Sequence, residues 1–293
     1  MKINEIIEQD TLFKNCTNIQ YEPLNGGLSN ETYVVTKDNT KYVVKIHFNQ
    51  NQYLGLTRQT EIEAQAKAAS MGISPQILSD ISCQEYSISE FIKGHLITYD
   101  EVKQEENIVK LAHTIKKIHS IEGVQRNCSV FDLIDKYAVG IEKFKVQVPE
   151  GYYDILKKAE TIRAARDKDK TEKDKYCHND FLNNNILFDE GKICVIDWEL
   201  SGMGDIYMDL GTLPYQMNFS EEKEKLLLTS YFGYYDEEMS LNLKNLKYAG
   251  MVREMLWGFF FEGLNQKSVN HDMDYHGAGN FVYERLHNGF ITF

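Results

Sequence analysis

The sequence lacks a paired-cysteine pattern. Its five cysteines, Cys16, Cys83, Cys128, Cys177 and Cys194, are odd in number, widely spaced and without a CxxC pair. Neither a disulfide framework nor a zinc site is therefore expected. Free thiols fit a reducing compartment, so the sequence predicts a cytoplasmic protein.

Export and membrane signals are missing as well. Residues 1–15 alternate acidic and apolar side chains, without the basic start and apolar run of a signal peptide. No apolar window approaches the length of a membrane span. We expect neither secretion nor a membrane partner.

Positive charge is scarce. There are 32 Lys and Arg against 44 Asp and Glu, which gives a formal net charge of -12. Binding a polyanion depends on clustered basic residues, so a nucleic-acid partner is not expected. With 42% hydrophobic and 12% aromatic residues, the chain is typical of a globular protein rather than a disordered one.

Two common phosphate-binding signatures are also missing. The sequence contains neither G-x-x-x-x-G-K-[ST] nor G-x-G-x-x-G, so P-loop and Rossmann proteins lose their main support. At 293 residues, the chain is long enough for one large domain or two unequal lobes.

The first third of the chain is predicted to be rich in strands. Residues 32–36 and 41–48 are β-branched and aromatic runs on either side of a turn-forming tetrapeptide, which predicts a hairpin. A helix is expected over residues 57–71, ending at Gly72, and another strand over residues 86–92.

The remainder of the chain is predicted to be mostly helical. Apolar residues recur at helical spacing from residue 108, and residues 221–235 and 241–265 show further helical patterns. The charged run 163–175 is interpreted as a solvated helix end or loop without a site. We expect an α+β protein with an N-terminal lobe of residues 1–93 and a helical C-terminal lobe of residues 94–293.

One segment carries the chemistry. It reads Cys-His-Asn-Asp-Phe-Leu-Asn-Asn-Asn-Ile-Leu-Phe over residues 177–188, and apolar runs at 186–188 and 193–196 predict a hairpin. Asp180, Asn185 and Asp197 lie at its ends, in the order of the catalytic-loop and metal residues of kinases. Each alone could be a turn former or a cap, but the joint pattern favours phosphoryl transfer, which needs a carboxylate and oxygen ligands for magnesium.

This pattern resembles a known family. H-N-D-x-x-x-x-N-I-L followed by V-I-D-W-E is similar to the choline kinase and aminoglycoside phosphotransferase superfamily, whose fold is similar to that of protein kinases. The resemblance implies a bilobal protein-kinase-like fold, ATP, Mg²⁺, Asp180 at the acceptor hydroxyl, and Asn185 and Asp197 as metal ligands. It also implies that His178 supports the loop rather than acting as a base.

The nucleotide lobe is expected around Asn25-Gly26-Gly27-Leu28-Ser29-Asn30. Glycines let backbone N–H groups approach phosphate oxygens, although Gly-Gly alone is most often a turn. The resemblance implies a phosphate loop here, with Gly26, Gly27, Ser29 and Asn30 as binding residues. It also implies that Lys45 meets the phosphates, and that its acidic partner is Glu61, with Glu63 as the alternative. Glu90, Phe91 and Ile92 would form the hinge that binds adenine.

The acceptor is predicted from the segment that follows Asp197. Trp198-Glu199 and the later Met208-Asp209-Leu210-Gly211 resemble the choline and ethanolamine kinases, especially the bacterial choline kinases of the LicA type. Aromatic faces and carboxylates hold a quaternary ammonium. Glu199, Tyr215, Trp257 and Phe260 are therefore candidates beside Asp180, although the aromatic residues at helical spacing equally fit a core.

The sequence thus predicts an ATP-dependent kinase that phosphorylates the hydroxyl of choline. The alternatives are a related kinase for ethanolamine, thiamine or an aminoglycoside, and a kinase-like binding module. Retention of Asp180, Asn185, Asp197 and Lys45 favours an enzyme. Residues 271–276, which contain His and Asp, are left unassigned because such loops are usually polar surface.

Overall fold

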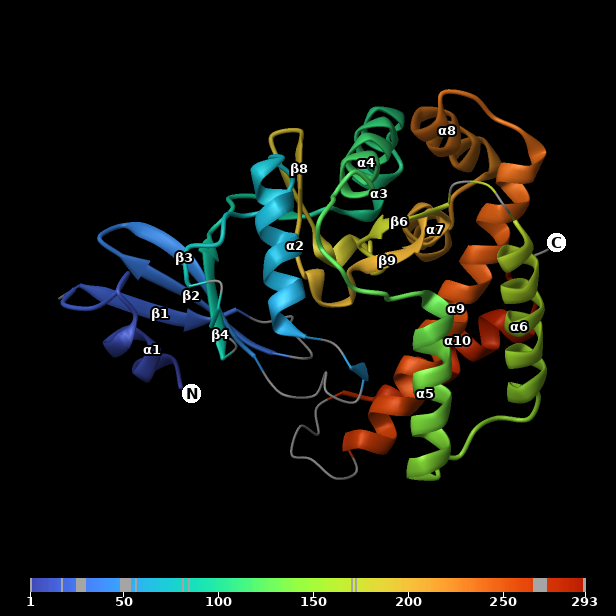
Figure 1. Ribbon diagram of the computed structural model, residues 1–293, viewed down its shortest axis with the longest axis horizontal. Helices are drawn as coiled ribbons and strands as arrows, with labels where there is room; N and C mark the ends of the chain where they lie inside the picture. Colours follow the sequence, from blue (N-terminus) through green and yellow to red (C-terminus); the bar gives the residue numbers. More distant parts are fainter. Residues whose placement is uncertain are drawn as a thin grey trace.

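The protein has a β-rich N-terminal part and a mostly helical remainder, which lie at opposite ends of the molecule in Figure 1. The computed structural model describes residues 2–16, 18–24, 30–47, 54–55, 57–80, 82–83, 85–169, 171, 173–265 and 273–291. The predicted α+β, bilobal arrangement is confirmed. The boundary predicted at residues 93–94 falls between the fourth and fifth strands, and remains a proposal.

The N-terminal part is an antiparallel sheet of order β1-β2-β3-β4. Its strands are β1 (Ile19–Pro23), β2 (Asn30–Lys37), β3 (Thr40–His47) and β4 (Tyr86–Glu90). The predicted hairpin is β2–β3, and its turn residues Asp38 and Asn39 both have positive φ, at 47° and 67°. Asp and Asn tolerate that left-handed conformation, which two-residue hairpin turns require.

One face of this sheet packs on α1 (Ile3–Gln9), a helix that the sequence pattern does not predict. Ile3 and Ile6 of the helix join Val44, Ile46 and other apolar side chains in a small core. Alternate residues of a strand point to opposite faces, so the residues between them, such as Lys45, face the other way.

Helix α2 (Arg58–Ser70) is the predicted helix of residues 57–71. Met71 caps its end, and Gly72 follows with a positive φ of 71° that suits glycine. The helix stands between the sheet and the rest of the molecule in Figure 1 and contacts η3 (Trp198–Leu200). It therefore links the two parts.

The C-terminal part is built around α9, the longest helix of the described residues, which packs against α5, α7 and α10. The helices are α3 (Tyr99–Val102), α4 (Glu105–Ile118), α5 (Val130–Phe144), α6 (Tyr152–Lys168), α7 (Ile206–Met217), α8 (Glu221–Phe232), α9 (Glu237–Asn265) and α10 (Tyr275–His287). Their apolar faces form one large core.

Two small sheets position the polar segment of residues 177–199. The first has the order β5-β7-β8 and the second pairs β6 with β9. The predicted hairpin is confirmed as β7–β8, and η2 (Asn183–Asn185) precedes it. The bounds are β5 (His95–Leu96), β6 (Asp174–Cys177), β7 (Ile186–Asp189), β8 (Lys192–Val195) and β9 (Gly202–Asp205).

The interpretation of residues 163–175 as a solvated segment is wrong in one respect. Arg166 is only 2% exposed, and its guanidinium contacts Asp205 at 2.8 Å and Asp169 at 2.7 Å. A buried guanidinium needs such partners, but a run of alternating charges does not indicate which of its residues are buried. The run anchors the end of α6 to β9.

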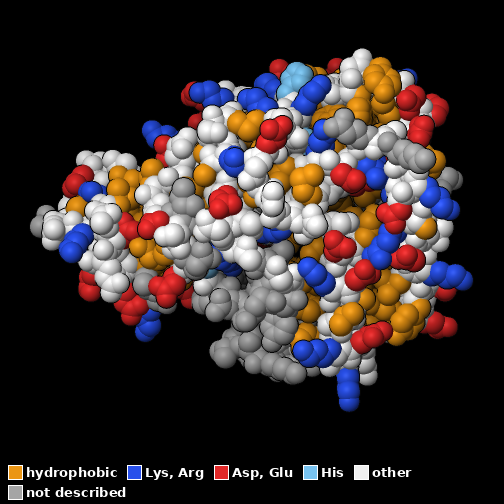
Figure 2. Space-filling view, viewed as in Figure 1, with side chains coloured by type: hydrophobic (Ala, Val, Ile, Leu, Met, Phe, Trp, Pro, Cys, Tyr) orange, Lys and Arg blue, Asp and Glu red, His pale blue; other side chains and the backbone are white. Residues whose placement is uncertain are grey.

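Acidic and basic side chains are interspersed on the face shown in Figure 2, so the net charge of -12 is not gathered into one patch there. Among the described helices, none combines the length and apolar character needed to cross a bilayer.

Candidate active site

Asp180 and Asn185 meet directly. The Asn185 Nδ2 donates to the backbone oxygen of Asp180 and to its Oδ2, both at 2.9 Å. The amide orientation follows from these bonds, because only nitrogen can donate to a carboxylate. The amide nitrogen is thus committed to Asp180, which leaves the Asn185 Oδ1 as the atom able to meet a cation.

Asp197 joins this pair at the end of β8. The backbone N–H of Ile196 donates to the oxygen of Asn185 at 2.9 Å, which places Asp197 at the same end of the β7–β8 hairpin. Asp197 has a positive φ of 65°, an unusual conformation for a residue other than glycine. Such conformations cluster at functional sites.

Lys45 reaches Asp197 from the N-terminal sheet. Its Nζ lies 2.8 Å from the Asp197 Oδ1 and 2.9 Å from the Glu61 Oε1. Burial disfavours the charge of Lys45, but Asp197 and Glu61 outweigh burial and raise its pKa. The contact selects Glu61 as the partner of Lys45, whereas Glu63 accepts a hydrogen bond from Gln59.

Arg58 ties this cluster to the start of β2. Its guanidinium lies 2.6 Å from Glu61, donates to the Asn30 Oδ1 at 2.9 Å, and lies 3.6 Å from Glu199. Burial opposes the ionisation of Glu61, but Lys45 and Arg58 outweigh it and lower the pKa of Glu61 to about 2. The sequence motifs do not predict Arg58, whose only signal is its place one helical turn before Glu61.

The carboxyl of Glu199 has a raised pKa, in contrast to that of Glu61. Burial, together with the neighbouring charge of Asp197, raises the pKa of Glu199 to about 7, although Lys45 opposes the shift. Its carboxylate lies 3.6 Å from Arg58 on the α2 side, and its predicted place beside the acceptor stays a prediction.

Asp209 holds the loop that carries Asp180. This fully buried carboxylate accepts the backbone N–H of His178 at 2.8 Å and that of Asn179 at 2.7 Å. It also lies 3.1 Å from the His119 Nε2. Hydrogen bonds from two consecutive amides fix the backbone one residue before Asp180.

His178 supports the same loop. Its Nε2 lies 3.1 Å from the oxygen of Ile196, so this nitrogen carries the proton, and its ring packs edge-on against Trp198 at 4.9 Å. Trp198 in turn donates to Ser74 at 3.1 Å. The side chain is fully buried, which agrees with a supporting role rather than that of a base.

Arg126 is a second unpredicted arginine. It donates to the backbone oxygens of Ser201 and Glu199, and to the Thr60 Oγ1 at 3.0 Å. It therefore fixes the segment after Asp197 against α2. An isolated arginine between two helices gives no signal of such a role in the sequence.

Arg253 is a third, and it touches Asp180 itself. The Arg253 Nη1 lies 2.9 Å from the Asp180 Oδ1, while Asn185 holds the other carboxylate oxygen. Burial opposes the charge of Arg253, but Asp180 outweighs it and raises the pKa of Arg253. The orientation of Asp180 is thus fixed from the loop and from α9.

Helix α9 carries Trp257, one of the residues predicted to contact the acceptor. Trp257 is partly exposed and packs against Tyr275 and Phe261, at ring distances of 5.5 and 5.4 Å. Gly258 permits this packing, since a Cβ there would lie 2.6 Å from the backbone nitrogen of Gly279 on α10. Glu254 lies one turn before Trp257, and burial raises its pKa to about 7.

Two predicted acceptor residues belong to the core instead. Phe260 is 2% exposed and packs against Tyr137 and Phe144, so it faces α5 rather than Trp257. Tyr215 is 1% exposed, and burial raises the pKa of its hydroxyl well above the usual value. Neither ring is available as a pocket wall, because helical spacing alone does not distinguish a core face from a ligand face.

Only some of the residues predicted to bind adenine and phosphate are among those that the structure describes. Gly26, Gly27 and Ser29 lie outside the described residues, whereas Asn30 begins β2 and is held by Arg58. The N–H of Glu90 already donates to the oxygen of Gln76 at 3.0 Å. Phe91 and Ile92 follow the end of β4 and remain the candidates for adenine contacts.

The residues present fit a hard divalent cation. The carboxylate of Asp197 and the amide oxygen of Asn185 lie at one hairpin end, and oxygen ligands are what Mg²⁺ prefers. With Asp180 beside them and Lys45 bound to Asp197, the arrangement can bind polyphosphate and activate a hydroxyl.

A family model described as "Phosphotransferase enzyme family" matches residues 20–241. The chain therefore belongs to the phosphotransferase enzyme family.

Among curated proteins, LicA of Haemophilus influenzae is 24% identical over 277 residues, which cover 90% of this chain and 77% of that protein. Two solved structures share the fold. A choline/ethanolamine kinase family protein from Mesorhizobium loti has a TM-score of 0.79 and 22% identity, with 98% of this chain and 93% of that chain covered. The choline kinase LicA from Streptococcus pneumoniae has a TM-score of 0.76 and 24% identity, with 94% of each chain covered.

Proposed function

We propose that this protein transfers the γ-phosphoryl group of ATP to the hydroxyl of choline. The observation that carries the proposal is a pair of contacts at one end of the β7–β8 hairpin: Asn185 lies 2.9 Å from the Asp180 carboxylate, and Lys45 lies 2.8 Å from that of Asp197. Membership of the phosphotransferase family and the similarity to LicA proteins support the reaction class and the acceptor.

In this proposal the nucleotide binds to the N-terminal lobe, residues 1–93. Lys45 contacts its phosphates, Gly26, Gly27, Ser29 and Asn30 flank them, and backbone groups of Phe91 and Ile92 contact adenine. Glu61 holds Lys45 in position at 2.9 Å. Asn185 and Asp197 would hold Mg²⁺, which neutralises phosphate charge when bound. ATP as the donor and the five free cysteines fit a cytoplasmic location.

The C-terminal lobe then supplies the acceptor. Asp180 accepts a hydrogen bond from the choline hydroxyl and takes its proton, as the hydroxyl oxygen bonds to the γ-phosphorus and the bond to ADP breaks. Arg253 and Asn185 hold the carboxylate in one orientation throughout. Catalysis rests on positioning and charge neutralisation rather than on covalent chemistry.

Trp257 and Glu254 favour a cationic acceptor. A quaternary ammonium cannot donate hydrogen bonds and is held by aromatic faces and nearby carboxylates. Trp257 is partly exposed beside the ring of Tyr275, and Glu254 lies one turn away on the same helix. Ethanolamine is the second candidate, because Glu254 equally suits a primary ammonium.

An ADP-release assay with choline, ethanolamine, thiamine and kanamycin tests the proposal. We expect the highest kcat/KM with choline. A preference for thiamine or kanamycin would overturn the acceptor assignment. Nucleotide binding without acceptor-dependent ADP release would instead identify a kinase-like binding module.

A further inference from the structure

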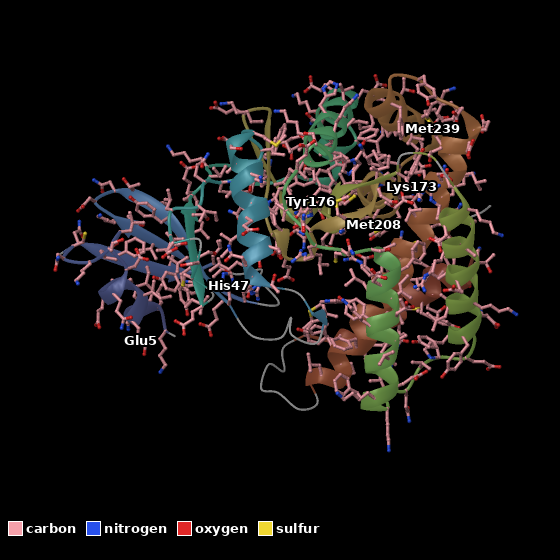
Figure 3. The ribbon with its side chains drawn as sticks, in the orientation of Figure 1. Glu5, His47, Lys173, Tyr176, Met208 and Met239 are labelled. Carbon is pink, nitrogen blue, oxygen red and sulfur yellow. The ribbon has the colours of Figure 1, made fainter. Side chains whose placement is uncertain are left out.

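His47 is the last residue of β3 and shares a face of the sheet with Lys45. Val44 and Ile46 pack into the small core under α1, and side chains alternate along a strand, so Lys45 and His47 both point away from that core. Figure 3 shows His47 between the N-terminal sheet and α2. The sequence motifs give this residue no role.

The side chain of His47 is partly exposed, but both of its ring nitrogens are buried. Neither ring nitrogen forms a hydrogen bond with any residue that the structure describes, although both are shielded from solvent. Burial lowers the pKa of His47 to about 4, so at neutral pH the ring has one donor and one acceptor. Unpaired buried polar groups are rare, and such a group beside a proposed binding site is a candidate for contact with the bound ligand.

The surroundings of His47 identify the ligand. The groups that act on it electrostatically are Glu61, Arg58, Lys45 and Asp197, which are the charged groups of the nucleotide half. Across the hairpin, His47 is paired with Asn30, the last residue of the predicted phosphate loop. A polyphosphate held by Lys45 would bring acceptor oxygens into this region, where the carboxylates are already occupied by Lys45 and Arg58.

We propose that His47 donates a hydrogen bond to a phosphate that bound ATP and ADP share. This inference rests on the proposed function, since it assumes that Lys45 meets nucleotide phosphates. His47 then favours binding of nucleoside polyphosphates over nucleosides, because a side chain beside Lys45 would contact the phosphates and not the base.

Binding of ATP, ADP, AMP and adenosine, measured by calorimetry on the full chain, tests this. His47→Phe keeps an aromatic ring but removes both nitrogens. We expect it to weaken ATP and ADP about tenfold, the size of one hydrogen bond to a charged group, and to leave adenosine within about twofold. His47→Gln keeps a donor and should recover most of the affinity.

Ile46→Val is the matched control, because it changes the neighbouring residue on the opposite, core-facing side of β3. It should lower the melting temperature slightly and change no ratio between nucleotides. Equal losses for ATP and adenosine in His47→Phe, or no loss at all, would overturn the role of His47. If the nucleotide pattern holds while the wild type shows no acceptor-dependent ADP release, the assignment of His47 stands and the proposed kinase activity fails.

Discussion

The loop around Asp180 and the α9 surface around Trp257 differ in how firmly their groups are held. In the loop, two backbone amides are bound by Asp209, and the carboxylate of Asp180 is held on both oxygens. On α9, Trp257 is partly exposed and Glu254 has a pKa raised to about 7 by burial. The first region is built for one geometry, and the second retains groups whose contacts and charge can change when a ligand binds.

This difference distinguishes the residues proposed to position the reacting groups from those proposed to select the acceptor. Phosphoryl transfer needs fixed positions, and a misplacement of about 1 Å can cost about 100-fold in rate. Acceptor choice instead depends on a pocket that exchanges water for a cation. We therefore expect changes in the loop to lower kcat, and changes on α9 near Trp257 to raise the KM for choline.

Asp209→Asn should have the largest effect among substitutions that support these two regions. The two oxygens of the Asp209 carboxylate each accept one backbone N–H, from His178 and from Asn179. The side-chain amide of Asn has one oxygen, so one of these N–H groups would lose its acceptor. We expect kcat to fall about 100-fold with little change in the KM for ATP. Steady-state kinetics with a melting curve measures this.

Tyr231→Phe is the control for Asp209→Asn. It removes the 2.7 Å bond to His119 at the far end of the same buried network and leaves the loop amides bound. Its kcat should stay within about threefold of the wild type. A folded Asp209→Asn enzyme with unchanged kcat would show that the loop does not depend on this carboxylate.

Arg253→Met should lower kcat about 10- to 100-fold, because among the described residues the Asp180 carboxylate then keeps only the bond from Asn185. Arg253→Lys, which retains the charge, should recover part of the rate. Arg166→Met is the control, since it breaks a buried ion pair with Asp205 that does not include Asp180 or Asn185. If both methionine variants lose the same kcat, Arg253 acts through stability alone.

Trp257→Ala should raise the KM for choline about tenfold and leave the KM for ATP unchanged, as expected for loss of one desolvated cation–π contact. The KM for choline of Trp257→Phe should lie between those of the wild type and of Trp257→Ala. The uncharged choline analogue 3,3-dimethyl-1-butanol separates charge from shape, because its KM should change less in Trp257→Ala. If Trp257→Ala raised the KM for choline and the KM for the uncharged analogue equally, the proposed cation–π contact would be wrong.

Glu254→Gln should have the smallest effect, visible mainly in the pH dependence. Burial raises the pKa of Glu254 to about 7, opposed by Arg253 and Arg285 and reinforced by Asp180, with Tyr215 also close. The carboxyl is thus neutral below about pH 7 and charged above it. A cation favours the charged form, so the KM for choline should fall as pH rises from 6 to 8 in the wild type.

In Glu254→Gln this dependence of KM on pH should be flattened, because the amide does not titrate. The pH profile for 3,3-dimethyl-1-butanol serves as the control, since an uncharged acceptor gains little from the carboxylate. An unaltered choline profile in the variant would assign the titration to another group.

The proposed catalytic segment could be predicted from the sequence because its residues are close together in the chain. Asp180, Asn185 and Asp197 lie at the ends of one hairpin, so a local pattern already specifies their proximity. The hairpin β2–β3 and helix α2 were predictable for the same reason, through turn residues and a terminal glycine.

The arginines could not be predicted, because their partners are distant in sequence. Arg253 meets a carboxylate 73 residues away, and Arg126 meets a backbone oxygen 75 residues away. The error at Phe260 has a related cause, since α9 packs against α5, α7 and α10 and most of its faces are therefore buried. Only the packing of the whole helix distinguishes Trp257 from Phe260.

Replacement of Asp180 tests the central claim most directly. Phosphocholine formation from ATP and choline is followed by phosphorus NMR in the wild type and in Asp180→Ala, with ADP binding measured on both proteins. We predict that the wild type forms phosphocholine, and that the variant loses at least about 100-fold in rate while binding ADP as before. Phosphocholine formation by Asp180→Ala at the wild-type rate would contradict the account.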